Sequence, residues 1–435
     1  MQRPCYILCA LLAALLLLPA CSKKKKENIK DYTNPHLKGF YLSSSNRAEG
    51  IEKTYFVVDT LQGMVYNEDS IDYHADLTRI IPIPTYYERV YSIAFDDEAW
   101  NEKDSLDFTR IHKITLVAGN RKRQATYQLD VRQHKVDPDS AAWHLRSSIA
   151  PGFTPTAFGL LTDGNTLYHL AANGHAGGCV STSSDGTVWT NVLTYSEDIE
   201  VISAQLTGGG ITALSSDGST SYRLELNNPA GGWTSATPTP VTLTALVGFI
   251  ADTVYATDGS AIYRFESGNW SEATLSEPLP TPFPARGAAC ASFKNRIFLY
   301  GGTDAAGNAL STAYSTMNDG RYWTSVMNRH TGRYEFGVRT GSTAVYYLKR
   351  VYLIGGNAED SGLPTRQVYV SRDEGFSWDK ATGNLYLPAA YAARSGCAAT
   401  VFKQSIWIAG GTLSDGSTTT DVWEGRLNRA DFIIQ

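Results

Sequence analysis

Strong charge and clustered histidines are both missing from this sequence, and each absence narrows its possible functions. Lys and Arg total 38 against 43 Asp and Glu, which gives a formal net charge of −5. A balance so close to neutral provides no electrostatic basis for binding nucleic acid. The 8 His residues are scattered, without the spacing of metal ligands. We therefore expect no nucleic-acid partner, no metal site and no cofactor.

Cysteine is also scarce, with 6 residues in the whole chain. Beyond Cys21 only Cys179, Cys290 and Cys397 remain, an odd number that does not indicate a disulfide framework. Cys290 and Cys397 hold similar places in two repeats that are not neighbours, so their thiols should be too far apart to bridge. We expect both to be buried as small apolar side chains.

An almost unbroken apolar run, Cys5–Ala20, follows Arg3 near the start of the chain. It is short for a membrane-spanning helix and has the length of a signal-peptide core. The run ends at Leu18-Pro19-Ala20-Cys21, which resembles a bacterial lipobox. We therefore expect a signal peptide at 1–20 and lipidation of Cys21. An ordinary secretory signal followed by a coincidental Cys is the alternative.

Residues 21–36 are polar and aperiodic, as expected for a lipid-anchored linker. The linker includes Lys23–Lys26, which could attract anionic lipid head groups or simply be solvated. These features predict an outer-membrane lipoprotein that contacts the membrane through its anchor. The lysine-rich start lacks the acidic signature often linked to surface export, so a periplasmic and a surface orientation both stay open.

Residues 37–136 show strand and hairpin patterns but share no repeat with residues 137–435. Tyr55–Val58 and Met64–Tyr66 flank a turn, and apolar residues alternate with polar ones in Gln124–Val131. The segment resembles the Ig-like N-terminal modules of lipoproteins from gut-dwelling Gram-negative bacteria. We expect a small Ig-like β-sandwich that acts as a spacer or a binding module.

A repeat occupies residues 137–435. Three segments each contain an Arg, small residues, an apolar run, a polar turn, a second apolar run and a Gly-Gly pair: Ala285–Gly302, Val338–Gly356 and Ala393–Gly411. The interval from the Arg to the first Gly is nearly the same in all three, so the copies are in phase. The expected turns are Lys294-Asn295, Lys349-Arg350 and Lys403-Gln404. Self-similarity with a period of roughly 50 residues is typical of a β-propeller or another repeat array.

Tryptophan positions predict the number of blades. Six tryptophans recur at comparable intervals: Trp143, Trp189, Trp233, Trp270, Trp323 and Trp378. The last repeat, from Arg394 onward, has three strands and no outer Trp in frame, whereas Ala141–Arg146 is an outer Trp strand with nothing before it. Joining the two closes a ring of six blades and removes exposed sheet edges. A competing closure would use Ala430–Gln435 as the missing strand.

The last three repeats resemble kelch repeats in their arginine, their glycine pairs and their outer tryptophan. The pairs are Gly301-Gly302, Gly355-Gly356 and Gly410-Gly411, and the first three blades lack them. The whole chain resembles an uncharacterised two-domain family of lipoproteins from gut anaerobes. The resemblance implies an all-β protein in which a small Ig-like β-sandwich precedes a six-bladed kelch-like β-propeller.

Ser371–Trp378 also matches the Asp-box, S-x-D-x-G-x-x-W, whose carboxylate bonds backbone N–H groups of a turn. Thr182–Trp189 and Thr316–Trp323 are degenerate versions, with Ser184 and Asn318 at the Asp position. We expect these boxes to be structural.

Three arginines, Arg286, Arg339 and Arg394, precede equivalent inner strands, so the ring symmetry should place them around one mouth of the central channel. In several kelch propellers the arginine at this position contacts an acidic ligand, and guanidinium groups suit carboxylates. The alternative is that each arginine pairs with a loop carboxylate or a carbonyl of the adjoining blade.

These features predict a non-catalytic, membrane-anchored binding protein that recognises a glycan or a protein at the channel mouth. The alternative is a sugar mutarotase resembling N-acetylneuraminate epimerase, which would need acid/base residues in the channel. Glu335, shortly before Arg339, is the candidate base for that reaction.

Overall fold

The computed structural model describes residues 29–317, 319–326 and 335–429 and divides the chain after Asp137 into two units. Within these ranges no helix is long and apolar enough to cross a membrane. The predicted signal peptide and Cys21 lie outside the described residues. Regular structure is almost entirely β, as the sequence predicted. Five short 3-10 helices complete the described elements: η1 (Ile29–Asp31), η2 (Ile51–Lys53), η3 (Leu77–Arg79), η4 (Pro229–Gly231) and η5 (Gly383–Leu385).

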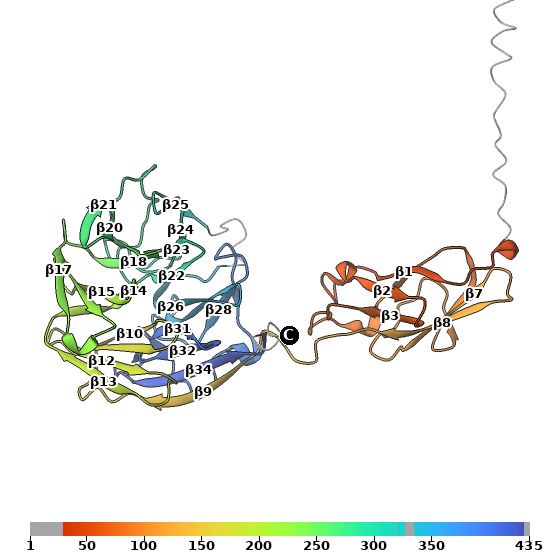
Figure 1. The fold of residues 1–435 in the computed structure, drawn as a ribbon, viewed down its shortest axis with the longest axis horizontal. Coiled ribbons are helices and arrows are strands. Elements are labelled where there is room, and N and C mark those ends of the chain that lie inside the picture. Colours follow the sequence, from red (N-terminus) through yellow and green to blue (C-terminus); the bar gives the residue numbers. More distant parts are fainter. Residues whose placement is uncertain (1–28, 318, 327–334, 430–435) are drawn as a thin grey trace, which may run out of the picture. The chain divides into compact units, whose positions relative to one another are not determined.

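The N-terminal unit is built from two sheets around one apolar core (Figure 1). The smaller sheet pairs β1 (Leu37–Leu42) with β4 (Pro82–Tyr86). The larger has the order β2-β3-β8-β7-β5-β6, with β2 (Phe56–Asp59), β3 (Met64–Asn67), β5 (Val90–Phe95), β6 (Glu98–Ala99), β7 (Lys113–Ala118) and β8 (Gln124–Asp130). Inward residues such as Phe40, Ile114 and Tyr127 are buried between the sheets, because side chains alternate along each strand. The unit is therefore a β-sandwich.

The second unit is a ring of six four-stranded antiparallel blades (Figure 1). From the inner strand outward, the first blade has β10 (Ala157–Thr162), β11 (Leu167–Ala172), β12 (Gly178–Ser183) and β13 (Thr190–Tyr195), and the second has β14 (Ile199–Thr207), β15 (Gly210–Ser215), β16 (Thr220–Glu225) and β17 (Thr234–Pro238). The third has β18 (Ala245–Ile250), β19 (Thr253–Thr257), β20 (Ile262–Glu266) and β21 (Asn269–Glu272), and the fourth has β22 (Ala289–Phe293), β23 (Arg296–Tyr300), β24 (Ala313–Met317) and β25 (Tyr322–Ser325). The fifth has β26 (Arg339–Tyr347), β27 (Arg350–Ala358), β28 (Val368–Ser371) and β29 (Asp379–Lys380), and the sixth has β31 (Ala398–Phe402), β32 (Ser405–Ala409), β34 (Asp421–Leu427) and β9 (Ala141–Ser148). A short ribbon, β30 (Arg394–Ser395) with β33 (Thr412–Leu413), extends the last blade.

The ring closes by pairing strands from opposite ends of the propeller sequence. β9 pairs antiparallel with β34 from Ala141↔Leu427 to Ser148↔Asp421, as the tryptophan count predicted. The segment 430–435, which would have formed the competing closure, lies outside the described residues. Because β9 covers the edge of β34, the last blade has its four strands.

Asp139, just before β9, fastens this closure through arginines from two blades. Its carboxylate lies 2.8 Å from Arg429 Nη2 and 3.5 Å from Arg372 Nη2, and it also pairs with Arg350. Burial acts to raise the pKa of Asp139, but hydrogen bonds from Arg350 and Arg429 outweigh it and leave that pKa below its ordinary value. The carboxylate is therefore ionised at neutral pH and ties β9 to the ring.

The inner hairpins turn through residues with positive φ. Lys294 and Asn295 have φ of 51° and 54°, and Lys403 and Gln404 have 44° and 60°, as the repeat predicted. In the fifth blade the prediction is wrong by one residue: the turn is Leu348-Lys349, because Arg350 already pairs with Tyr347 as the first residue of β27. Paired positive-φ residues are typical of the tight type I′ hairpin.

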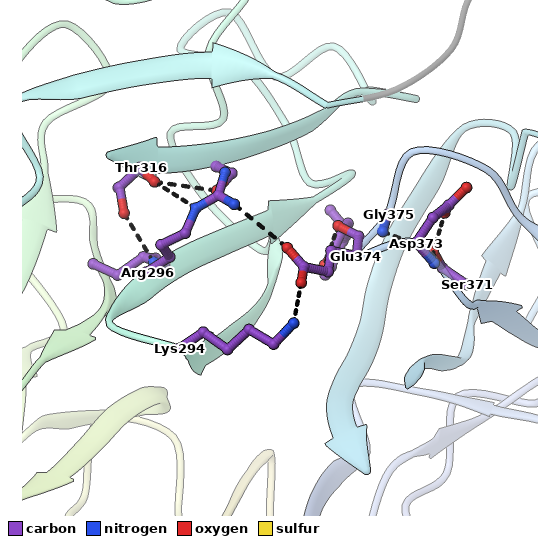
Figure 2. Close-up of polar contacts among 10 residues, drawn as sticks. Lys294, Arg296, Thr316, Ser371, Asp373, Glu374 and Gly375 are labelled. Atoms are coloured by element: carbon purple, nitrogen blue, oxygen red, sulfur yellow. Dashed lines mark hydrogen bonds and ion pairs between the residues drawn. The ribbon is translucent and has the colours of Figure 1, made fainter. Parts of the chain in front are cut away.

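The Asp-box of the fifth blade forms as expected and also docks on the fourth blade (Figure 2). Within the box, Ser377 N donates to Asp373 Oδ1 at 2.8 Å and Gly375 N donates to Ser371 Oγ at 2.7 Å. Between the blades, the Glu374 carboxylate pairs with Lys294 and lies 3.4 Å from Arg296 Nη1. The box is therefore an inter-blade contact, which supports its structural role.

In the degenerate Asp-box of the first blade, the predicted Asp position is wrong by one residue. Ser184 was expected at the Asp position, but the carboxylate that accepts from the turn is Asp185, from Thr187 N at 2.8 Å and Val188 N at 3.1 Å. The pKa of Asp185 lies well below its ordinary value, mainly because of hydrogen bonds from Thr187. This turn is one residue shorter than in the fifth blade, which shifted the alignment. Asn318, in the other degenerate box, lies outside the described residues.

Candidate functional site

A cavity of about 240 Å³ occupies the centre of the ring, and we call it the channel cavity. All six inner strands, β10, β14, β18, β22, β26 and β31, or the residues directly before them, contribute to its lining. Small residues such as Gly159, Gly341 and Ala398 dominate the lining, because six strands converge there. Arg286 is the one charged side chain among the described residues that line it, and it is exposed.

The channel cavity contains little that could transfer a proton. Over the described part of the chain, its lining includes neither a carboxylate nor an imidazole. Cys290 and Cys397 both line it, as free thiols. Burial raises the pKa of Cys290 to about 12 and also raises the pKa of Cys397, so both are protonated at neutral pH. The site can therefore offer hydrogen bonds and a guanidinium, but no activated nucleophile.

Arg339 lies in a different place, a cavity of about 510 Å³ on the fifth blade that we call the blade-5 pocket. Its side chain is buried, with 6% exposed. Arg339 Nη2 donates to Tyr369 Oη at 3.0 Å and Nε donates to the carbonyl oxygen of Phe336 at 3.3 Å, while the guanidinium lies over the Tyr369 ring. Arg339 Nη1 has no hydrogen-bond partner among the described residues.

Arg394 is fully buried and lines neither cavity. Its Nε donates to the carbonyl oxygen of Ala392 at 2.9 Å and its Nη1 to that of Gly410 at 3.4 Å. Its guanidinium lies 4.0 Å from the centre of the Tyr391 ring and within 3.6 Å of Asp421. These contacts agree in part with the alternative interpretation: a carboxylate lies beside the arginine, but the carbonyl oxygens of Ala392 and Gly410 belong to the sixth repeat itself and not to the adjoining blade.

The three arginines therefore do not gather at one mouth, and strand register explains why. Arg339 pairs with Ala358 and Arg394 with Leu413, each two residues after a glycine pair, but Arg286 bridges to Thr303, one residue after its pair. A slip of one residue directs a side chain to the opposite face of a strand. Arg286 thus occupies the place of Thr340 and Ser395, which pair with Asn357 and Thr412.

A glycine could have revealed this register from the sequence. Gly287, Gly341 and Gly396 all precede the first glycine of their pair by the same interval, whereas Arg286 lies one residue closer to its pair than Arg339 and Arg394 do to theirs. These three glycines have φ of 63°, 64° and 64°, a region that other residues enter at a cost. The constant interval marks equivalent backbone positions, so aligning on the arginines misplaced Arg286 by one residue.

The ring of six blades, with glycine pairs and Asp-boxes in its repeats, makes this chain a two-domain protein with a kelch-like β-propeller. More specifically, the chain belongs to the DUF6242 family. Residues 137–435 match the "DUF6242 beta propeller domain", and residues 23–131 match the "Domain of unknown function (DUF6242) N-terminal domain".

A solved structure titled "Structure of YjhT" is also similar, with a TM-score of 0.49 and 13% sequence identity. The similarity covers 64% of this chain and 95% of that one. A likeness this distant says nothing about function. No curated protein matches the chain.

Proposed function

We propose that this protein is a non-catalytic binding protein that recognises a glycan or a protein ligand at the mouth of its propeller channel. The observation that supports this most is Arg286, an exposed guanidinium on a cavity lined by all six blades. No described residue pairs with this guanidinium, so it is available to an anionic group of a ligand. Charge-assisted hydrogen bonds from arginine to a carboxylate are among the stronger polar contacts.

The proposal includes an anchor at Cys21 that holds the protein to the outer membrane. The lipobox-like sequence at residues 18–21 supports it. Only the part of the predicted linker before Ile29 would then act as the spacer, because Thr33 N and Asn34 N donate to Glu88 of the N-terminal unit, which corrects the predicted linker 21–36. Mass spectrometry of the protein purified from membranes tests the anchor through the mass of its N-terminal peptide.

The channel lining favours binding over the mutarotase alternative. A mutarotase needs a proton donor and acceptor beside the sugar ring. The described lining has neither a carboxylate nor an imidazole, and Glu335, the candidate base, lines neither cavity.

A glycan array, followed by titration of its strongest ligand, tests the channel mouth. Arg286→Ala should weaken binding about tenfold, which corresponds to roughly 1.4 kcal/mol. Arg321→Ala, an exposed arginine of the same blade that lines neither cavity, should bind like the wild type. If Arg286→Ala bound the ligand as tightly as the wild type, the channel mouth would not be the binding site. Accelerated exchange of sialic acid or aldose anomers in NMR spectra would instead show that the protein is a mutarotase.

A further inference from the structure

The blade-5 pocket is separate from the channel cavity, because the two share no lining residue. It lies between the start of β26, the loop after β27, and the strands β28 and β29. Its volume of about 510 Å³ falls within the range of small-molecule sites, which extends over about 300–1,000 Å³. The pocket is therefore large enough for a ligand of its own.

Two hydrogen-bond donors on its lining have no acceptor among the described residues. Arg339 Nη1 is one, since no described residue accepts from it. Tyr369 supplies the second: its hydroxyl oxygen accepts from Arg339 Nη2 at 3.0 Å, so the hydroxyl proton must point elsewhere. Both residues are only 6% exposed, and leaving a buried donor without an acceptor destabilises the folded protein. A group that accepts from both would remove that destabilisation.

A carboxylate is the group that matches this pair of donors. Its two oxygens can accept from Arg339 and from Tyr369 at the same time, and its charge complements the guanidinium. Buried arginine keeps its charge, so an anion is favoured over a neutral acceptor. The hydroxyl-bearing or amide residues Ser361, Thr365 and Gln367 also line the pocket and can bind hydroxyl groups of the ligand.

The remaining charges of the lining restrict the charge of the ligand. Lys380 adds a second cation on the exposed side of the pocket, while Glu359 and Asp360 add two carboxylates. These four charges sum to zero, so the preference for a carboxylate rests on the local pair Arg339 and Tyr369 and not on the net charge of the lining. A dianion would meet about twice the repulsion from Glu359 and Asp360 that a monoanion meets.

We infer that the blade-5 pocket is a second ligand site of this protein, specific for a small monocarboxylate that carries hydroxyl groups, such as an acidic sugar. Arg339 Nη1 and the Tyr369 hydroxyl hold the carboxylate. The site does not depend on Arg286 or on binding at the channel mouth.

Saturation-transfer NMR on the full chain tests this site with three six-carbon probes: D-glucuronate, D-glucose and the open-chain dianion D-glucarate. Glucuronate should bind saturably, and glucose and glucarate should each bind at least about tenfold more weakly.

Tyr369→Phe removes one donor and should weaken glucuronate binding about tenfold. Lys380→Met, on an exposed residue that cannot affect folding much, should weaken it about threefold. Arg366→Gln is the control, because Arg366 does not line the pocket and instead contacts the Tyr386 ring and the carbonyl oxygen of Leu387.

The absence of saturable glucuronate binding would overturn the inference. So would equal binding of glucose, or glucuronate binding that is unchanged in both Tyr369→Phe and Lys380→Met. Arg286→Ala separates the two sites. Glucuronate binding that disappears in Arg286→Ala alone would place the carboxylate in the channel and also overturn the inference. Unchanged glucuronate binding in Arg286→Ala supports an independent pocket, whatever the outcome at the channel mouth.

Discussion

His169, in β11 of the first blade, is a fully buried imidazole that lies between two aromatic rings. The ring centroids of Phe158 and Trp189 both lie 6.0 Å from its own, and neither ring nitrogen has a hydrogen-bond partner among the described residues. Burial lowers the pKa of His169 from 6.5 to about 4, because the apolar surroundings disfavour the charged form. The residue is therefore neutral at pH 7 and acts as a flat core side chain.

This burial predicts a specific loss of stability in acid. The unfolded chain binds a proton at His169 below about pH 6.5, and the folded protein does so only near pH 4, so stability falls as pH drops through this window. The loss at pH 4 is at most about 3 kcal/mol. His169→Phe should flatten the pH dependence of the urea midpoint between pH 6.5 and pH 4. His112→Gln, on an exposed histidine of the N-terminal unit, is the control and should leave this dependence unchanged. If the urea midpoint of His169→Phe depended on pH as it does in the wild type, His169 would not be the cause of the acid destabilisation.

At the scale of the element, the Asp-box turns act as contacts between neighbouring blades. In three of them a glycine lies against an aromatic ring of the preceding blade, and the outer tryptophan donates to the carbonyl oxygen of that glycine. The pairs are Gly186 with Trp407, Gly320 with Tyr255, and Gly375 with Tyr300. Each turn thus closes its own outer hairpin and packs against the preceding blade.

Gly375→Ala tests how much one such contact contributes. An added Cβ would lie 2.6 Å from a ring carbon of Tyr300, at a φ of 98° that alanine adopts only under strain. We expect a loss of about 3 kcal/mol or more, since both overpacking and backbone strain apply. Gly383→Ala, at a φ of 57° with open space around its Cβ, isolates the backbone strain and should cost about 1 kcal/mol. Equal losses in chemical denaturation would mean that the contact between blades contributes nothing.

At the scale of the whole propeller, stability depends on β9, which comes first among the propeller strands in the sequence but completes the last blade. β9 covers the edge of β34, and Asp139 ties the start of β9 to Arg350, Arg372 and Arg429. Without β9 the last blade would expose the backbone groups of β34, a template for pairing with another chain.

Two truncated chains test this dependence. A chain that begins at residue 138 retains β9 and Asp139 and should be monomeric, with one cooperative thermal transition. A chain that begins at residue 149 lacks both and should aggregate or melt about 10 °C lower or more, because an open edge and several ion pairs are lost together. Size-exclusion chromatography and circular dichroism give both readouts. A stable monomer from the shorter chain would show that closure by β9 is dispensable.

The sequence by itself determined the architecture of the propeller. The outer tryptophans recur once per blade, and the incomplete last repeat matches the unpaired strand at Ala141–Arg146, so counting alone predicts six blades and the strand that closes them. Such periodic features depend on local alternation and on the need to cover sheet edges, both of which are visible in a linear chain.

Only the tertiary structure decided what the arginines do. Arg286, Arg339 and Arg394 look equivalent in sequence, yet one lies exposed on the channel cavity, one is buried in a separate pocket and one is enclosed by carbonyl oxygens and Tyr391. A shift of one residue in strand register separates Arg286 from the other two. Arg339 and Arg394 share a register and differ in their neighbours, Tyr369 for one and Gly410 and Asp421 for the other, which come together only on folding. The blade-5 pocket escaped the sequence for the same reason, because the loop after β27 and β28 bring Glu359 and Tyr369 beside Arg339 only after folding.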